Sequence, residues 1–376
     1  MGILAKMKAI NNIKGVAAMN DEKYMQLALD EAKKGIGYVT PNPLVGAIIV
    51  KDGVIIGRGY HAKAGNPHAE AVAIMRAGDL RGATLYVTLE PCSHYGKTPP
   101  CVDAILAAGI KTVVIGSEDP NPLVSSVEKM RQAGIDVRTD ILRDECEALN
   151  AVFFHYIRTQ LPYIVLKYAM TLDGKLATKT GASKWITSDI ARHHVHEWRH
   201  ALTGIMTGIG TILIDDPMLD CRIENGVNPI RIICDTNLRL PLHARVVKTA
   251  PNIPTWIASS ITDTQTHEPY IEAGCHIIVV PKQEEHLDLT VLRQKLGASG
   301  IDSILLEGGA TLNAAALAAG IVNKIHAYVA PKIFGGIKAP TPVAGLGVDT
   351  PNEAWQFGAP KMSALGDDIL IECEVR

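Results

Sequence analysis

Four side chains in one part of this sequence are of the types that hold and use a catalytic zinc ion. His68 and Glu70 lie in the run PHAEA, and Cys92 and Cys101 lie in EPCSHYGKTPPC. A zinc ion that performs chemistry typically has three protein ligands and one open position for water. We therefore expect His68, Cys92 and Cys101 to bind one zinc ion, and Glu70 to take and return the proton of the attacking water.

Two other interpretations of these residues stay open on the sequence. His94 could be a fourth ligand, which would make the zinc structural, or the cysteines could be unconnected core residues. Against a structural site, a fourth protein ligand would leave Glu70 without a role. Against unconnected cysteines, H-A-E lies at the expected start of a helix and E-P-C at the expected end of a strand, as in zinc deaminases. The loop SHYGKTPP between the cysteines replaces the two-residue gap of the commonest deaminase signature.

The bulk composition is that of an ordinary globular protein. With 376 residues, 47% apolar and 20% charged, the chain is long enough for two domains. A net charge of −2 gives no reason to expect a nucleic acid or an anionic membrane as partner, and no apolar run is long enough to span a bilayer. Seven cysteines behind no recognisable leader favour reduced thiols in the cytoplasm.

Strand and helix patterns alternate along the chain and predict an α/β fold. Residues 47–60 are typical of a hairpin that turns at Asp52-Gly53, and 69–78 and 83–89 of a helix and a buried strand. The alternation is interrupted near 150–162 and then resumes, with helices expected over 188–202 and 311–319. We expect layered domains with largely parallel sheets, a boundary near residue 160 and a tail over 1–17.

Several longer runs resemble one known family. TPNPLVGAIIV, GRGYHAKAGNPHAEAVA, TLYVTLEPCSHYGKTPPC and EDPNPLV, in this order, are similar to the RibD/RibG family of bifunctional riboflavin-biosynthesis enzymes. That resemblance implies a cytidine-deaminase-like three-layer domain over 18–160, which deaminates a phosphoribosylated diaminopyrimidine. It also implies that the pyrimidine and its ribose phosphate are bound by Asn42, His61, His94, Lys97, Asp119 and Asn121. The loop after DPNPLV is shorter here than the family usually has.

The second half carries further runs that resemble the same family. KYAMTLDGKLAT, SKWITSD, TGIGTILIDDPMLDCR and LLEGGATLN imply a dihydrofolate-reductase-like domain over 161–376 that uses NADPH. The implied cofactor contacts are Ala169, Trp185, Thr211, Asp215, Thr236 and Gly309. The implied substrate contacts are Ser183, Arg199, Leu219, Arg222 and Glu307, with Lys167 as an additional polar group. From the residues alone, only EGGATLN suggests a phosphate site, because its glycines precede a helix.

One motif in this half points to a different chemistry. HEWRH, residues 196–200, spells the H-E-x-x-H signature of zinc proteases, and His196 and His200 share a helix face. Neither a third ligand nor the Met-turn that accompanies the motif follows, and the resemblance gives Arg199 a substrate role. We therefore expect one zinc ion per chain.

Two functions of other classes agree less well with the sequence. A deaminase of nucleic acid or free nucleosides fused to an unrelated reductase is disfavoured by the low charge and by few aromatic residues. A binding module with structural zinc would give Glu70 no function. The family resemblance also implies homo-oligomers, and Arg239 is a candidate partner of the NADPH 2′-phosphate.

Overall fold

The chain forms two compact units. The computed structural model describes residues 21–95, 99–121 and 124–376. One unit comprises Met1–Thr159 and the other Gln160–Arg376, so the division lies beside the predicted boundary at residue 160. The predicted tail over 1–17 lies outside the described residues. No described helix is both long and apolar enough to cross a membrane.

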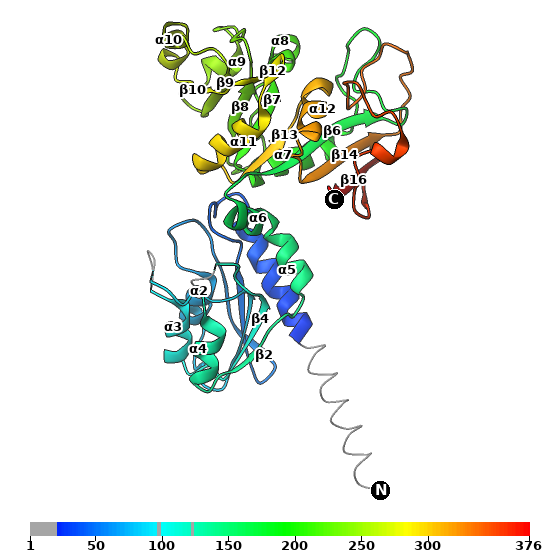
Figure 1. The fold of residues 1–376 in the computed structure, drawn as a ribbon. Coiled ribbons are helices and arrows are strands. Elements are labelled where there is room, and N and C mark those ends of the chain that lie inside the picture. The colour runs from blue at the N-terminus through cyan, green and yellow to red at the C-terminus, as the bar shows by residue number, and fades with distance from the viewer. Residues whose placement is uncertain (1–20, 96–98, 122–123) are drawn as a thin grey trace. The chain divides into compact units, whose positions relative to one another are not determined.

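The first unit is built on five strands (Figure 1). Its order in the chain is a helix over 21–32, η1 (Lys33–Gly35), β1 (Gly46–Lys51), β2 (Val54–Tyr60), α2 (Ala69–Arg76), β3 (Thr84–Leu89), α3 (Cys101–Ala107), β4 (Thr112–Ser117), α4 (Ser126–Gln132), β5 (Asp136–Arg138), α5 (Arg143–Leu149) and α6 (Ala151–Thr159). The strand order across the sheet is β2-β1-β3-β4-β5.

This sheet is the middle of three layers, because the strand β1 has apolar side chains on both of its faces. On β1, Ala47 and Ile49 pack with α2, α3 and α4, whereas Ile48 and Val50 pack with the 21–32 helix and α5. Successive side chains of a strand point to opposite faces, so a strand that is apolar throughout must be covered on both. The three-layer domain is therefore confirmed.

The expectation of a largely parallel sheet is wrong for this unit. β3, β4 and β5 are parallel, but β1 pairs antiparallel with both β2 and β3. The predicted hairpin of β1 and β2 is present. β1 lies between β2 and β3, which α2 connects, and it runs antiparallel to both, so two of the four strand pairings are antiparallel.

The second unit contains a nine-stranded sheet. Its elements are β6 (Tyr163–Thr171), α7 (Asp189–Ala201), β7 (Gly204–Gly208), α8 (Ile209–Asp215), β8 (Ile230–Cys234), α9 (Arg245–Lys248), β9 (Thr255–Ser259), α10 (Thr264–Glu272), β10 (His276–Val279), β11 (Lys282–Gln283), β12 (His286–Leu287), α11 (Leu289–Ala298), β13 (Ser303–Leu306), α12 (Ala310–Ala318), β14 (Lys324–Ala330), η2 (Pro351–Glu353), β15 (Lys361–Leu365) and β16 (Asp368–Glu374). Across the sheet the order is β10-β9-β8-β7-β13-β6-β14-β16-β15.

The strands of this sheet are parallel from β10 to β14, and only β16 and β15 are antiparallel. Helices cover both faces: Met206 of β7 packs with α11 and α12, whereas its neighbour Ile205 packs with α8, α9 and α10. Helix α7 covers the part of the sheet formed by β14 and β16. The carboxyl ends of seven parallel strands thus lie along one edge, where open α/β sheets bind ligands.

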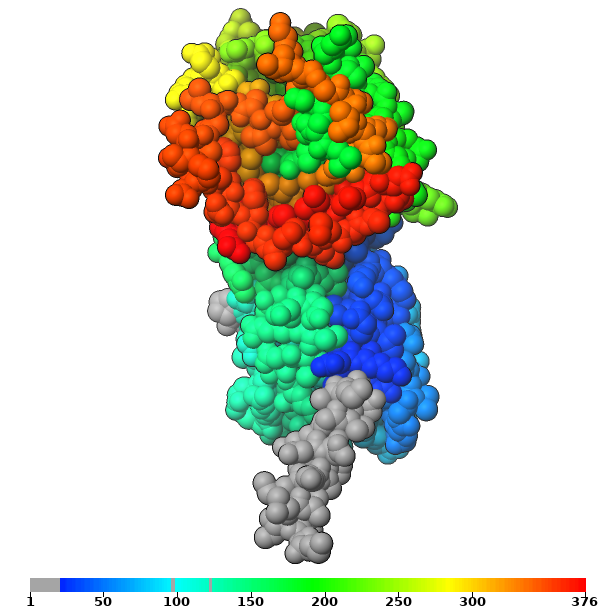
Figure 2. Space-filling model, turned by 90° about the vertical axis from the view of Figure 1, so that its right-hand side faces the viewer, coloured from blue at the N-terminus to red at the C-terminus, as the bar shows by residue number. Residues whose placement is uncertain are grey.

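Two long connections lie side by side along the surface of this unit. Figure 2 shows the segment after β6 (green) beside the segment after β14 (orange). The Leu172 amide donates to the carbonyl of Lys332 at 2.9 Å, and the Leu176 amide donates to that of Pro340 at 2.8 Å. Leu176 and Pro340 both line a cavity of about 530 Å³ in this unit, so these connections form part of its wall.

Candidate active sites

Three ends of secondary structure bring the predicted zinc ligands together. His68 is the residue before α2, Cys101 is the first residue of α3, and Cys92 follows β3. Their ligand atoms all lie within 4.8 Å of one another. The His68 Nδ1 atom is 3.5 Å from the Cys92 sulfur and 3.3 Å from the Cys101 sulfur.

This donor set fits zinc. One imidazole nitrogen and two sulfurs are typical of a catalytic site with an open fourth position. The hydrogen bond between the two thiols lowers the pKa of Cys92 and raises the pKa of Cys101, so the pair favours one thiolate, at Cys92. Among the residues that the structure describes, this is the one cluster of potential metal ligands. His94 is exposed and is not part of it.

Glu70 lies in the first turn of α2, beside the ligands. Its side chain is only 3% exposed, and burial raises the pKa of its carboxyl group. Both Glu70 and His68 line a cavity of about 410 Å³ within the first unit. A buried carboxyl group beside the open side of a metal site is suited to proton transfer.

The same cavity contains most of the side chains predicted to bind the pyrimidine. Asn42 and His61 make a hydrogen bond of 3.0 Å between Nδ2 and Nε2. The other ring nitrogen of His61 donates to the carbonyl of Pro67 at 3.2 Å, so Nε2 is the acceptor for Asn42. His61 is 3% exposed, and burial lowers its pKa. His61 therefore fixes the amide of Asn42, whose oxygen can face a ligand. The predicted contacts that line the cavity are Asn42, His61, His94, Asp119 and Asn121, while Lys97 lies outside the described residues.

Glu90 was not predicted to have a role, although it stands in the E-P-C motif. Its Oε1 atom accepts hydrogen bonds from the amide and hydroxyl of Ser126, at 2.9 and 2.8 Å, and from the Val127 amide at 3.2 Å. Its Oε2 atom accepts from the Asp119 amide at 3.4 Å. Glu90 thus ties the segment that carries Cys92 to the segment that carries Asp119. A sequence cannot show these contacts, because the partners are up to 37 positions away.

The second unit has a larger cavity, of about 530 Å³, at the carboxyl ends of β7, β8 and β13. This is a usual volume and a usual place for a cofactor in a parallel sheet. Four of the predicted cofactor contacts and one predicted substrate contact line it: Thr211, Asp215, Thr236, Gly309 and Ser183. Arg239 also lines it, as do His286 and Leu287, which were not predicted.

Glycines make room in this cavity for a ligand to approach the backbone. A Cβ atom at Gly210 would meet nothing within 4 Å, and one at Gly309 would meet only the Thr211 hydroxyl at 3.9 Å. Neither glycine has a positive φ, so turn geometry does not explain them. Gly309 is the residue before α12, whose first N–H groups favour a phosphate. The cavity therefore fits a dinucleotide such as NADPH.

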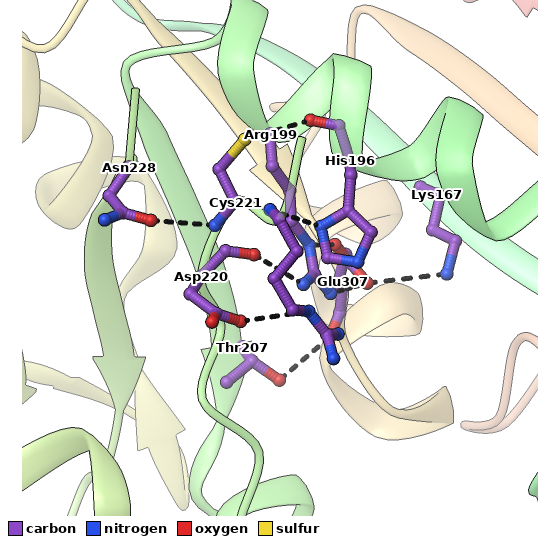
Figure 3. Close-up of polar contacts among 9 residues, drawn as sticks. Lys167, His196, Arg199, Thr207, Asp220, Cys221, Asn228 and Glu307 are labelled. Atoms are coloured by element: carbon purple, nitrogen blue, oxygen red, sulfur yellow. Dashed lines mark hydrogen bonds and ion pairs between the residues drawn. The ribbon is translucent and has the colours of Figure 1, made fainter. Parts of the chain in front are cut away.

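A buried ion cluster lies beside this cavity (Figure 3). Arg199 donates from Nε and Nη2 to the two carboxylate oxygens of Glu307, at 2.7 and 3.1 Å, and Lys167 reaches the same carboxylate at 3.4 Å. Burial alone would raise the pKa of Glu307, but the charges of Arg199 and Lys167 outweigh it and lower the pKa to about 2. Glu307 follows β13 and precedes the glycines of the cavity, and Thr207 of β7 donates to its carbonyl at 2.8 Å.

The remaining predicted contacts are not in the lining of either cavity. Ala169 is a half-buried residue of β6, and Leu219 is buried with a φ of 51°. Arg222 is 61% exposed, and its Nε atom is 3.4 Å from Asp220. The Trp185 ring is exposed and stacks with the guanidinium of Arg192, 4.5 Å from the ring centroid. The structure thus brings five of these predicted reductase residues to the cavity and two, Arg199 and Glu307, to the adjoining cluster.

The H-E-x-x-H histidines face backbone rather than each other. Nδ1 of His196 accepts the amide hydrogen of Arg222 at 3.2 Å, and Nδ1 of His200 accepts that of Val227 at 3.0 Å. Nitrogens used in this way do not bind a metal, and these histidines form no ligand cluster within the described part of the chain.

Comparisons with known proteins agree with this geometry. The cytidine and deoxycytidylate deaminase zinc-binding region matches residues 18–117, and the RibD C-terminal domain matches residues 162–371. The riboflavin biosynthesis protein RibD of Actinobacillus pleuropneumoniae is 48% identical over 357 residues, which cover 94% of this chain and 95% of that protein. The Escherichia coli RibD is 41% identical, with 94% and 99% covered.

Two solved structures have the same architecture over almost their full length. Acinetobacter baumannii RibD is 36% identical with a TM-score of 0.85, and 96% of this chain and 99% of that chain are covered. The Thermotoga maritima diaminohydroxyphosphoribosylaminopyrimidine deaminase/5-amino-6-(5-phosphoribosylamino)uracil reductase is also 36% identical, with a TM-score of 0.82 and 96% and 100% covered. The chain belongs to the RibD family of bifunctional deaminase/reductases of riboflavin biosynthesis.

Proposed function

We propose that the first unit hydrolytically deaminates 2,5-diamino-6-(5-phosphoribosylamino)pyrimidin-4-one and that the second reduces the ribosyl group of the product with NADPH. The product of both steps is 5-amino-6-(5-phosphoribitylamino)uracil. The observation that carries the proposal is Glu70, a buried carboxyl group beside three zinc ligands in a cavity lined by polar side chains. The glycine-lined cavity of the second unit supports the reductase half.

Each residue of the first site has a definite task in this reaction. His68, Cys92 and Cys101 would hold a zinc ion, which would activate a water molecule as the nucleophile. Glu70 accepts a proton from the water and delivers it to the amino group that leaves as ammonia. Asn42, held by His61, presents its amide to the ring, where a carboxamide can pair with donor and acceptor edges.

The second site holds two reactants in register. NADPH supplies the hydride. The N-terminus of α12 and the glycines before it are placed to bind the cofactor's phosphates. Glu307 holds Lys167 and Arg199 together in a buried cluster next to this cavity, which fixes the end of β13 from which the glycines of the cavity follow.

Replacement of Glu70 tests the proposal. Glu70→Gln keeps the size of the side chain but cannot take a proton, so ammonia release should fall by roughly 10²-fold or more. NADPH oxidation with the supplied deaminated intermediate should continue at the wild-type rate, and one zinc ion per chain should remain bound. A matched control is Glu31→Gln, because Glu31 is as buried, at 6%, but pairs with Lys34 and Arg58 away from the cavity.

Two results would contradict the proposal. Undiminished ammonia release by Glu70→Gln would remove Glu70 from the chemistry. Deamination of cytidine or single-stranded DNA in preference to the diaminopyrimidine would assign another substrate. We also propose a cytoplasmic enzyme, since none of the seven cysteines is in a disulfide, as is usual in a reducing compartment.

A further inference from the structure

Two histidines of helix α7 hold one loop of the second unit, here called the 219–228 loop. His196 accepts the backbone N–H of Arg222 at 3.2 Å, and His200, one helical turn later, accepts that of Val227 at 3.0 Å. The two contacts are five loop residues apart, so the histidines fix the loop at two points. Both histidines belong to the H-E-x-x-H motif, which has no part in the proposed chemistry.

Further contacts attach the start of the same loop to α7 (Figure 3). Nη1 of Arg199 donates to the carbonyl of Asp220 at 2.9 Å. The Cys221 thiol donates to the carbonyl of His196 at 3.5 Å, and the Cys221 amide donates to the side chain of Asn228 at 2.8 Å, which closes the loop on itself. Arg199 is also the residue bound to Glu307, so one helix face positions both the buried ion cluster and the loop.

These contacts require unprotonated nitrogens on both rings. An Nδ1 atom that carries a proton cannot accept an amide hydrogen. Burial, and then the charges of Arg199 and Arg222, lower the pKa of His196 to about 4. The His196 ring is therefore neutral near pH 7, and its Nδ1 atom is available as an acceptor.

The loop carries a cation that faces solvent beside the ion cluster. The Arg222 side chain is 61% exposed, and its Nε atom lies 3.4 Å from the carboxylate of Asp220. A guanidinium binds a phosphate well only when its planar fork is oriented, because two parallel hydrogen bonds must form. The backbone of Arg222 is oriented by His196.

We propose that His196 and His200 are positioning residues, which hold the 219–228 loop so that Arg222 presents its guanidinium to the phosphate group of the reductase substrate. The proposal rests on the proposed function of the second unit. It gives the H-E-x-x-H motif a task without a metal. It also separates the two arginines, since Arg199 anchors the loop and the Glu307 carboxylate, and Arg222 binds the ligand.

The test compares His196→Leu, which loses the acceptor, with His196→Asn, whose amide oxygen can occupy the place of Nδ1. In His196→Leu the KM for 5-amino-6-(5-phosphoribosylamino)uracil should rise about fivefold to tenfold, the effect of one lost hydrogen bond. Amide hydrogen exchange in peptides covering 219–228 should become faster. In His196→Asn both quantities should stay close to wild type, and in both variants the KM for NADPH and the rate of ammonia release should be unchanged.

The matched controls are His193→Leu and His193→Asn, on the same helix with a side chain 63% exposed, which should change nothing. Equal KM values for His196→Leu and His196→Asn would overturn the proposal, as would faster exchange in His196→Leu without a higher KM. If His196→Leu does not fold, His200→Leu and His200→Asn test the Val227 contact by the same criteria. A wild-type enzyme that does not reduce the intermediate would instead refute the proposed function, while the exchange rates still show whether the histidines hold the loop.

Discussion

Replacing Glu307 with glutamine should destabilise the second unit by an amount that the structure allows us to calculate. The carboxylate is 12% exposed and compensates two cations, Arg199 at 11% and Lys167 at 16% exposed. Its pKa falls from 4.5 to about 2, and this difference corresponds to about 3 kcal/mol of unfolding free energy at neutral pH. Glu307→Gln removes the charge and leaves two buried cations without a counter-ion, a change that typically costs about 3–5 kcal/mol.

The sign of the pH dependence follows from the direction of the shift. A carboxyl group whose folded pKa is lowered stabilises the fold fully above its unfolded pKa of 4.5, and that stabilisation is lost as the pH falls toward the folded value of about 2. The difference between wild type and Glu307→Gln should therefore be largest at pH 6 to 7. Near pH 3.5 it should have fallen to about 2 kcal/mol.

Tryptophan fluorescence during urea unfolding measures this change selectively. All four tryptophans lie after residue 160, so their signal reports the second unit alone. The urea midpoint should fall by roughly 1–2.5 M, because a loss of about 3–5 kcal/mol is divided by a slope of about 2–3 kcal/mol per M. The control is Glu197→Gln on α7, whose carboxylate is 53% exposed and should contribute less than about 0.5 kcal/mol. A midpoint for Glu307→Gln equal to that of wild type, or a difference independent of pH, would refute the reasoning.

Three further predictions concern the two sites. In Cys101→Ser, elemental analysis should find no zinc and ammonia release should be lost, whereas NADPH oxidation with the deaminated intermediate should continue. Retained zinc and deamination would exclude Cys101 as a ligand. Glu90→Gln should keep its zinc and raise the KM for the diaminopyrimidine by about fivefold, because the Asp119 segment loses a charged anchor; an unchanged KM would show that this anchor is dispensable. Gly309→Val should weaken NADPH binding about tenfold in a fluorescence titration, while its urea midpoint stays close to wild type. An NADPH affinity equal to that of wild type would place the cofactor elsewhere.

The zinc site could be predicted because its ligands lie in short motifs of typical residue types. A histidine directly before a helix and a cysteine directly after a buried strand are recognisable locally, and each lies where the motif placed it. One failure of the helix and strand patterns concerns non-local pairing. The hairpin of β1 and β2 was predicted, but the antiparallel pairing of β1 with β3 depends on which strand edge remains available after folding.

Contacts between distant residues were beyond prediction from the residues. The Arg199–Glu307 pair joins positions 108 apart, and no periodicity in the sequence indicates that they meet. The segment around 150–162 was interpreted as an interruption, yet Phe153 and Ile157 of α6 line the deaminase cavity. The H-E-x-x-H motif is a familiar metal-binding pattern, but here its two histidines accept hydrogen bonds from backbone amides.

The central claim is that one chain carries both reactions in separate sites, and a coupled assay tests it most directly. Wild-type protein with zinc, the diaminopyrimidine substrate and NADPH should release one ammonia and oxidise one NADPH for each substrate consumed. Without NADPH, ammonia should still be released and the deaminated intermediate should accumulate. Ammonia release without any NADPH oxidation, or oxidation of NADPH before deamination, would contradict the account.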